Sequence, residues 1–223
     1  MSIINRVINR ANFFILKLRI QKHEALLRAL GNLPAYEGQG LEFLKEQYSY
    51  YTKNISTPNM AASLELIIFI SRLCRAMKFR KLLDMGSGFT SFCLRYHAKT
   101  DLLVKVWSVD DNEQWLEKTQ QYLKRNELST ENLVTLQHFI SSGEGGFDLL
   151  LLDLNFVEER KKYIQLAVER CSPGGIILFD DVHKREFLWE ILQQTKNFPV
   201  KLYDLKAITL DEFGRYALLA IKH

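Results

Sequence analysis

Long hydrophobic runs are absent from this sequence of 223 residues. Apolar stretches such as Phe13–Leu16 and Leu66–Ile70 are far shorter than the ~18 residues that a membrane-spanning helix needs. The start of the chain lacks the small-residue cleavage site of a secretory signal. We therefore expect neither a transmembrane helix nor secretion.

Cysteine and histidine are also scarce. The three cysteines form no CxxC pair, and an odd number argues against a disulfide framework. The five histidines show neither HExxH nor zinc-finger spacing. These absences exclude a disulfide scaffold and the common zinc motifs, and a reducing, cytoplasmic location is expected.

Charge is spread unevenly along the chain, whose net charge is +4. The first 23 residues contain no acidic side chain, so the rest of the chain is nearly neutral and no nucleic acid is expected as a partner. The basic residues of this first segment are Arg6, Arg10, Lys17, Arg19 and Lys22.

The same N-terminal segment has the pattern of an amphipathic helix. Apolar residues recur at helical spacing from Ile3 to Leu18, and we predict one helix over residues 3–30. We expect residues 1–30 to lie outside the sheet as an arm. Three partners would cover its apolar face: its own domain, a second copy in a homodimer, or an anionic membrane contacted peripherally.

Two further helices are predicted before residue 80. The first is a short helix over Leu41–Tyr51. The second runs over Thr57–Met77, with Thr57 as its N-cap and Pro58 at its first helical position.

From residue 80 onward, short apolar segments alternate with amphipathic helical ones. Strands are predicted at 80–85, 103–109, 132–138, 147–152, 175–180, 199–204 and 215–222, and helices at 89–97, 112–125, 156–170 and 184–196. This alternation is typical of the α/β class with a Rossmann-like, doubly wound sheet, here of seven mostly parallel strands. Only a loop joins the last two strands, so the last strand should run antiparallel.

The segment KLLDMGSGFTSFCLR carries the most information about chemistry. A buried strand leads into Gly86-Ser87-Gly88, and a helix starts directly after it. Glycines let the backbone approach a ligand closely, and the helix N-terminus offers free N–H groups to an anion. Asp84 precedes this loop, where its carboxylate would repel phosphates and favour an ammonium group.

Three common loop motifs do not fit this segment. The dinucleotide fingerprint needs a glycine where Ser91 stands. No GK[ST] follows, as a P-loop would require. Met85 replaces the first glycine of a G-x-S-x-G elbow, which makes Ser87 a poor nucleophile.

The stretch LLDMGSG resembles the first motif of the class I S-adenosylmethionine-dependent methyltransferases, in which DxGxG joins a strand to a helix. The resemblance covers residues 57–223, the expected methyltransferase domain, and leaves residues 1–56 as a helical extension, an arm or lid. It implies S-adenosylmethionine as the cofactor. Asp84 would lie near its methionine part, with Gly86, Ser87 and Gly88 as the loop beneath it.

The next strand and helix, VWSVDDNEQWLEKTQQYLKRN, also resemble this family. An acid at the end of the second strand of such sheets binds ribose hydroxyls, and Asp110 is our choice for that role. Asp111 joins the predicted cofactor-binding set, with helix N-capping as its alternative. After strand 132–138, Ile140 and Ser141 fall where the family lines its adenine pocket, with an ordinary turn as the alternative.

Acidic residues end two more strands: Asp153 ends one, Asp180 and Asp181 end the next, and His183 follows. They resemble the site of the catechol O-methyltransferase branch and its small bacterial relatives, which hold Mg²⁺ with Asp and an Asp-Asn pair. Here Asp181 stands in place of Asn, and the catalytic lysine of that branch has no match.

Three interpretations of these residues remain open: helix capping, a Mg²⁺ site, and metal-free substrate binding with a carboxylate or His183 as base. Asp153, Asp181 and His183 are the catalytic candidates, and metal dependence stays undecided.

The resemblance implies an enzyme that transfers a methyl group to a hydroxyl of a small molecule or of a glycan- or lipid-linked acceptor. One alternative is a binding or assembly protein with the same fold that has lost catalysis. Another is a nicotinamide-dependent oxidoreductase, which Asp84 and Ser91 disfavour.

Overall fold

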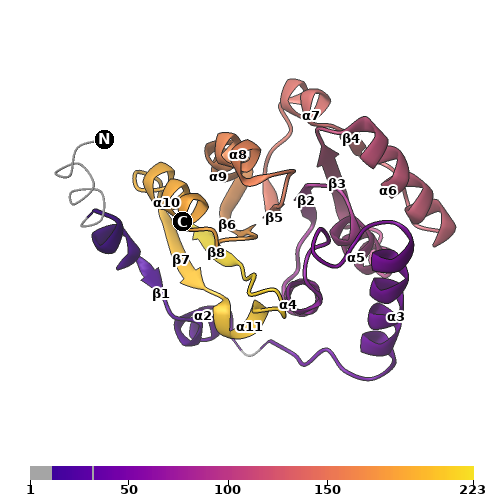
Figure 1. The fold of residues 1–223 in the computed structure, drawn as a ribbon, viewed down its shortest axis with the longest axis horizontal. Coiled ribbons are helices and arrows are strands. Elements are labelled where there is room, and N and C mark those ends of the chain that lie inside the picture. The colour runs from indigo at the N-terminus through magenta and orange to yellow at the C-terminus, as the bar shows by residue number, and fades with distance from the viewer. Residues whose placement is uncertain (1–11, 32) are drawn as a thin grey trace.

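A mixed sheet of eight strands organises the computed structural model, which describes residues 12–31 and 33–223 (Figure 1). In space the strands follow the order β1-β7-β8-β6-β5-β2-β3-β4, and β8 alone among these pairs antiparallel with its neighbours. They are β1 (Ile20–Gln21), β2 (Lys81–Met85), β3 (Lys105–Asp110), β4 (Leu133–Thr135), β5 (Phe147–Leu152), β6 (Cys171–Phe179), β7 (Val200–Asp204) and β8 (Leu218–Lys222). The predicted fold class and the antiparallel last strand are confirmed, but the described part of the chain forms eight strands instead of the predicted seven, because β1 adds to the edge of the sheet at β7.

Helices cover both faces of this sheet (Figure 1). They are α2 (His23–Leu30), α3 (Gln39–Asn54), α4 (Leu64–Ala76), α5 (Phe89–Ala98), α6 (Glu113–Arg125), α7 (Leu136–Ser142), α8 (Val157–Arg160), the 3₁₀ helix η1 (Lys161–Tyr163), α9 (Ile164–Arg170), α10 (Arg185–Gln194) and α11 (Lys206–Thr209). Among the described residues, no helix has the length and apolar character required to cross a bilayer.

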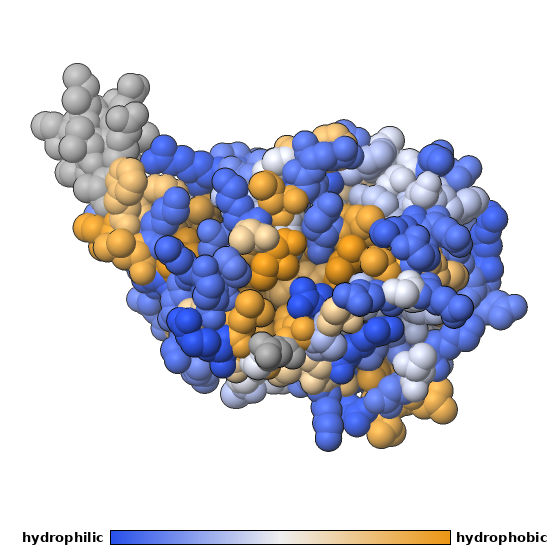
Figure 2. Space-filling view, turned by 90° about the horizontal axis from the view of Figure 1, so that it is seen from below, coloured by the Kyte–Doolittle hydropathy of each residue, from blue (hydrophilic) through white to orange (hydrophobic). Residues whose placement is uncertain are grey.

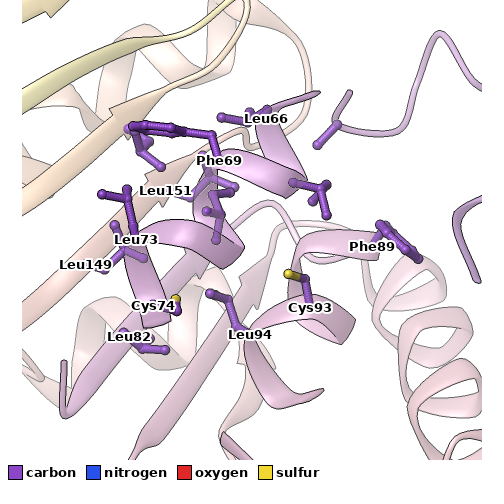
Figure 3. Packing of buried hydrophobic residues seen from close by; sticks show 14 of the residues in the cluster. Leu66, Phe69, Leu73, Cys74, Leu82, Phe89, Cys93, Leu94, Leu149 and Leu151 are labelled. Carbon is purple, nitrogen blue, oxygen red and sulfur yellow. The ribbon is translucent and has the colours of Figure 1, made fainter. Parts of the chain in front are cut away.

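Alternate residues of the central strands enter two hydrophobic clusters, one on each face. Leu82 of β2 belongs to the cluster that includes residues of α4 and α5. Phe69 and Leu73, both on α4, are buried in this cluster (Figure 3). Leu83 and Met85 point to the opposite cluster, which contains residues of α9 and α10. The two-residue period of a strand therefore places Asp84 on the α5 side, beneath the start of that helix.

The N-terminal segment differs from the prediction of one helix over residues 3–30. Residues 1–11 lie outside the described part; residues 12–17 are helical, and β1 interrupts the helical pattern before α2 begins. Ile20 pairs with Leu202 of β7, because an unpaired sheet edge favours an added strand. The expectation that residues 1–30 stay outside the sheet is therefore wrong for β1.

One side of this segment packs on its own domain. Phe13 is 8% exposed and its ring lies 5.9 Å from that of Trp189. Phe14, Ile15 and Leu18 remain exposed, and Figure 2 shows apolar side chains gathered at this end of the molecule. Part of the segment therefore packs on its own domain. A homodimer contact and a membrane contact stay predictions. The predicted boundary between an extension of residues 1–56 and a domain of residues 57–223 also stays a prediction.

The predicted helix over Thr57–Met77 begins later, at Leu64. The Ser63 hydroxyl accepts the Leu66 N–H at 3.2 Å and is the real N-cap of α4. The Thr57 hydroxyl instead donates to Asn59 Oδ1 at 2.7 Å, which holds residues 57–60 in a turn. Residues 55–63 therefore form a connecting loop.

The predicted strand 132–138 is shorter than expected. β4 ends at Thr135, whose hydroxyl accepts the His138 N–H at 3.2 Å and caps α7. Residues 136–142 are helical because this cap satisfies a free N–H group at the start of the new helix.

Candidate functional site

A cavity of about 490 Å³ opens where β2, β3 and β5 end. Its size lies within the range of small-molecule binding sites. Four chain segments line it: the end of α3 with the following loop, the β2–α5 loop, the β3–α6 turn and the segment after β5. The lining residues are Tyr51, Ile55, Ser56, Thr57, Met60, Ala61, Ala62, Gly86, Ser87, Gly88, Phe89, Thr90, Asp110, Asp111, Asn112, Trp115, Asp153, Asn155, Phe156 and Arg160.

The glycine loop forms the floor of this cavity. Gly86 has φ +114°, and a Cβ atom there would lie 2.5 Å from the carbonyl carbon of Asp153. Only glycine fits, because the end of β5 passes directly against the loop. A Cβ atom on Gly88 would approach the Tyr51 hydroxyl at 3.1 Å, so α3 closes the loop from above.

Asp84 holds the loop to the helix that follows it. Its carboxylate is fully buried and accepts hydrogen bonds from the Thr90 hydroxyl, at 2.8 and 2.9 Å, and from the Ser91 hydroxyl at 2.6 Å. Burial raises its pKa to about 7, although these hydroxyls oppose the shift. Asp84 does not line the cavity, so its predicted contact with an ammonium group would run through Thr90, which does.

Asp110 connects the second strand to the same loop. Its Oδ2 accepts the Ser87 N–H at 2.9 Å and the Ser87 hydroxyl at 3.0 Å, and its Oδ1 accepts the Asn112 N–H at 3.0 Å. Burial raises the pKa of Asp110 to about 6. A carboxylate has about four lone-pair sites, so acceptor capacity remains for a ligand hydroxyl in the cavity.

Asp111 also lines the cavity, and Asn155 donates to its Oδ2 at 2.8 Å. The capping role considered for Asp111 belongs to Asn112, whose side chain accepts the Trp115 N–H at 3.1 Å.

Ile140 and Ser141, predicted to line an adenine pocket, lie on α7, and the cavity does not reach them. The Ser141 hydroxyl donates to Gln137 O within that helix. Because α7 starts early, these side chains follow the helix instead of the strand end. Trp115 is nearer to the predicted cofactor loop: its Nε1 donates to Ser87 O at 2.5 Å.

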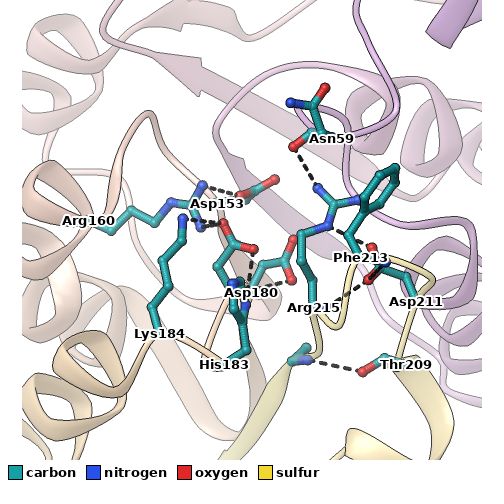
Figure 4. Close-up of polar contacts among 12 residues, drawn as sticks. Asn59, Asp153, Arg160, Asp180, His183, Lys184, Thr209, Asp211, Phe213 and Arg215 are labelled. Carbon is teal, nitrogen blue, oxygen red and sulfur yellow. Dashed lines mark hydrogen bonds and ion pairs between the residues drawn. The ribbon is translucent and has the colours of Figure 1, made fainter.

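The predicted catalytic carboxylates meet around an arginine that the sequence did not single out. Arg160 is 6% exposed, with one Nη2–Oδ1 distance of 2.6 Å to Asp153 and one Nη1–Oδ2 distance of 3.0 Å to Asp181 (Figure 4). Asp153 and Arg160 line the cavity, while Asp181 lies behind them. The α8 segment places Arg160 seven residues after Asp153, and no local motif indicates an ion pair across that distance.

The pKa values of the two carboxylates move in opposite directions. Burial raises the pKa of Asp153 well above its usual range, and the neighbouring Asp180 and Asp181 add to that shift against Arg160. Burial acts on Asp181 as well, but Arg160, Lys184 and His183 together lower its pKa. Asp153 is thus the better proton acceptor of the pair, and Asp181 the permanent anion.

His183 lies beside this cluster and outside the cavity lining. Its Nδ1 is 3.6 Å from Asp181 Oδ1, and neither atom has a hydrogen-bond partner in the described part of the chain. Burial lowers the pKa of His183, against the opposing effect of Asp181.

A Mg²⁺ ion does not fit these residues as they stand. Mg²⁺ needs oxygen ligands at about 2.0–2.1 Å in octahedral geometry. Arg160 already bridges Asp153 and Asp181, and Asp180 Oδ1 accepts the Asp181 N–H at 2.7 Å. Within residues 12–31 and 33–223, no group of three or more His, Cys, Asp or Glu side chains is placed to hold a metal.

Arg215, in the loop before β8, anchors the segment that covers the cavity. Its guanidinium donates to Pro58 O and Ala61 O, both at 3.0 Å, and to Asn59 O at 2.9 Å, and its Nε donates to Asp211 at 2.6 Å; Figure 4 shows the contacts with Asn59 and Asp211. These bonds hold the loop that contributes Met60, Ala61 and Ala62 to the lining.

Replacing Arg215 by alanine should therefore weaken binding of S-adenosylhomocysteine by on the order of 10-fold, measured by calorimetry, because about 1.4 kcal/mol of loop ordering would fall on the binding step. Arg72→Ala is the matched control, since Arg72 donates to the carbonyls of Leu33 and Pro34 away from the cavity. Equal affinities for both variants would contradict the anchoring role.

Comparisons with known proteins match one segment of the chain and its fold. Residues 83–182 match a family model described as a methyltransferase domain. No curated protein matches the sequence.

Solved structures share the fold. The O-methyltransferase TomG from Streptomyces achromogenes, in complex with SAM, has a TM-score of 0.61 at 17% identity, over 85% of this chain and 92% of TomG. An O-methyltransferase from Bacillus cereus, in complex with SAH, also has a TM-score of 0.61, at 16% identity, over 93% and 100% of the two chains. A tRNA (m1A58) methyltransferase from Aquifex aeolicus has a TM-score of 0.54 at 13% identity, over 74% and 70%.

The matched segment, 83–182, contains the glycine loop, Asp110, Asp153 and Arg160. This segment therefore resembles a methyltransferase domain, and the chain has the fold of solved methyltransferases in complex with SAM or SAH.

Proposed function

We propose that the protein transfers a methyl group from S-adenosylmethionine to a hydroxyl oxygen of a small molecule or of a glycan- or lipid-linked acceptor. The observation that carries this proposal is one cavity that joins the glycine loop and Asp110 to the Asp153–Arg160 ion pair. The first half suits the cofactor, and the second half suits an oxygen that must lose a proton.

Residues of this chain would hold the cofactor through backbone and carboxylate groups. The carboxylate of its methionine part would bind at the Gly86–Gly88 loop and the free N–H groups at the start of α5. Asp110 would accept the ribose hydroxyls. When bound, S-adenosylmethionine supplies a methyl group activated by its sulfonium.

The acceptor side needs a base and a group that orients oxygen. Asp153, with its raised pKa, accepts the proton of the acceptor hydroxyl as the new C–O bond forms and the methyl–sulfur bond breaks, which leaves S-adenosylhomocysteine. Arg160 donates to the oxygen and aligns it. TomG and the Bacillus cereus protein, which share this fold, are O-methyltransferases, which supports an oxygen acceptor.

Asp110→Asn tests the cofactor half of the proposal. The amide loses the charge and one acceptor for Ser87, so the affinity for S-adenosylhomocysteine should fall by roughly 10–100-fold, as hydrogen bonds to charged groups contribute about 1.5–3 kcal/mol. Calorimetry measures the change. The matched control is Asp148→Asn, because Asp148 likewise accepts two backbone N–H groups, from Arg80 and Lys81, at the opposite end of β2.

Two outcomes would count against this proposal in different ways. If folded wild-type protein binds NAD and not S-adenosylhomocysteine, the methyltransferase function is wrong. If wild type and Asp110→Asn bind S-adenosylhomocysteine equally, only the ribose role of Asp110 is wrong. Binding without turnover on any hydroxyl in an acceptor screen would favour a binding protein that has lost catalysis.

A further inference from the structure

We propose that Arg160 is the fixed cation of the acceptor site, which takes the place that a divalent metal would need and holds the acceptor oxygen in a metal-independent reaction. This inference rests on the proposed function. It states which group balances the negative charge of the carboxylates in the same site. Its basis is the hydrogen bonding of the Arg160 side chain.

Hydrogen bonds and ion pairs hold the guanidinium of Arg160 at all three of its nitrogen atoms. Its Nε donates to Leu154 O and Asn155 O at 3.1 and 3.2 Å, and its Nη2 donates to Asn155 O at 2.9 Å. Nη2 also contacts Asp153, and Nη1 contacts Asp181. Because two backbone carbonyls fix its plane, the guanidinium cannot move aside without leaving those oxygens unpaired.

One N–H of Nη1 has no acceptor in the described part of the chain, while Arg160 lines the cavity. A guanidinium carries five N–H donors; hydrogen bonds use three of them and Asp153 pairs with Nη2 as an ion pair, so the second N–H of Nη1 remains. The remaining donor can bind a ligand oxygen. It would stabilise the negative charge that develops there as Asp153 takes the proton, which is the electrostatic part of what a metal would supply.

The surrounding charges also suit a resident cation. Three carboxylates end β5 and β6 within one cluster, and uncompensated acids are costly to hold together. Arg160 neutralises Asp153 and Asp181, and Lys184 Nζ lies 3.3 Å from Asp181 Oδ2 (Figure 4). Arg160 stays charged because its carboxylate neighbours outweigh the effect of burial and raise its pKa. A divalent ion could therefore bind only by expelling the guanidinium.

The test measures metal binding and needs no acceptor. Wild-type protein is titrated with MgCl₂ and MnCl₂ by calorimetry, and its melting temperature is compared in 10 mM MgCl₂ and in EDTA. We expect no saturable binding and a shift below about 1 °C. S-adenosylhomocysteine binding is measured on the same samples, so that a failure of the cofactor assignment is seen separately.

Arg160→Ala should convert the cluster into a metal site. With the guanidinium gone, Asp153, Asp180 and Asp181 present free oxygens, and 10 mM MgCl₂ should raise the melting temperature by roughly 3–6 °C if the site binds with a Kd of about 1 mM. Arg160→Lys keeps the charge and should stay insensitive to Mg²⁺. Adding Asp181→Asn to Arg160→Ala should reduce the Mg²⁺ shift, which would locate it in this cluster.

Saturable binding of Mg²⁺ or Mn²⁺ to wild type that Asp181→Asn removes would overturn the proposal. So would an Arg160→Ala protein that folds and gains no metal response. If Arg160→Ala does not fold, the wild-type titration and the Arg160→Lys variant decide: metal binding by either overturns the proposal, and its absence in both supports it.

Discussion

Replacing Gly86 by alanine is expected to abolish measurable binding of S-adenosylhomocysteine and to lower the free energy of unfolding by roughly 2–5 kcal/mol. Two costs combine. Alanine at a φ of +114° is strained, and its Cβ atom would lie 2.8 Å from Leu154 N and closer still to Asp153. Neither neighbour can yield, because both are backbone at the end of β5. Denaturant unfolding and calorimetry measure the two effects.

Gly174→Ala separates these two costs. Gly174 also has a positive φ, +78°, but a Cβ atom there would meet no heavy atom within 4 Å. It should lose about 1 kcal/mol from the backbone conformation alone and leave cofactor binding unchanged. If Gly86→Ala is no more damaging than Gly174→Ala, the close approach between the loop and β5 does not matter for stability.

The pH dependence of stability should change strongly when Asp84 is replaced by asparagine. Burial raises the pKa of Asp84 to about 7 in the folded state, from about 3.9 in the unfolded chain. The stability due to the protonated carboxyl is fully present below pH 4 and is lost as the pH rises to about 7. The loss reaches on the order of 4 kcal/mol for a shift of about three pKa units. The amide of Asp84→Asn has no charge to bury, so this part of the slope should disappear.

Urea unfolding from pH 4.5 to 8 measures this difference between wild type and Asp84→Asn. Asp101→Asn is the control, because the Leu103 N–H and Arg80 lower the pKa of this exposed carboxylate, so it titrates below the measured range and its replacement should leave the slope unchanged. If the pH profiles of wild type and Asp84→Asn are parallel, ionisation of Asp84 does not lower the stability of the folded protein and this prediction is wrong.

Local patterns predicted the central part of the fold well. β2, β3 and β5 and the helices after β2 and β3 begin and end close to the predicted residues, since each is a run of strand or helix pattern bounded by glycine or polar caps. The start of α4 was misplaced because Thr57-Pro58 looks like a helix start, whereas Ser63 makes the actual capping bond. β1 depends on pairing with β7 across the chain, which no local pattern contains.

The residues of the site also divide into those that local sequence patterns predict and those that depend on tertiary contacts. The glycine loop, Asp110 and Asp153 follow directly from strand ends, and the cavity brings them together. Arg160 could not be singled out, because VEERKKY contains several basic residues and only the tertiary contact with Asp181, 21 positions away, selects one. Ile140 and Ser141 follow the predicted strand 132–138 in sequence, but β4 ends at Thr135, so both residues lie on α7.

The neighbours of β2 in the sheet have a consequence for how the chain folds. At the end of β2, Met85 pairs with Val109 of β3 and with Leu152 of β5, so the strands that end at the cavity join segments up to 67 positions apart. Contacts between distant segments require closing long loops and form slowly. A chain still emerging from the ribosome therefore has no binding site until β5 has been made, and recognition of the cofactor reports that the central sheet is complete.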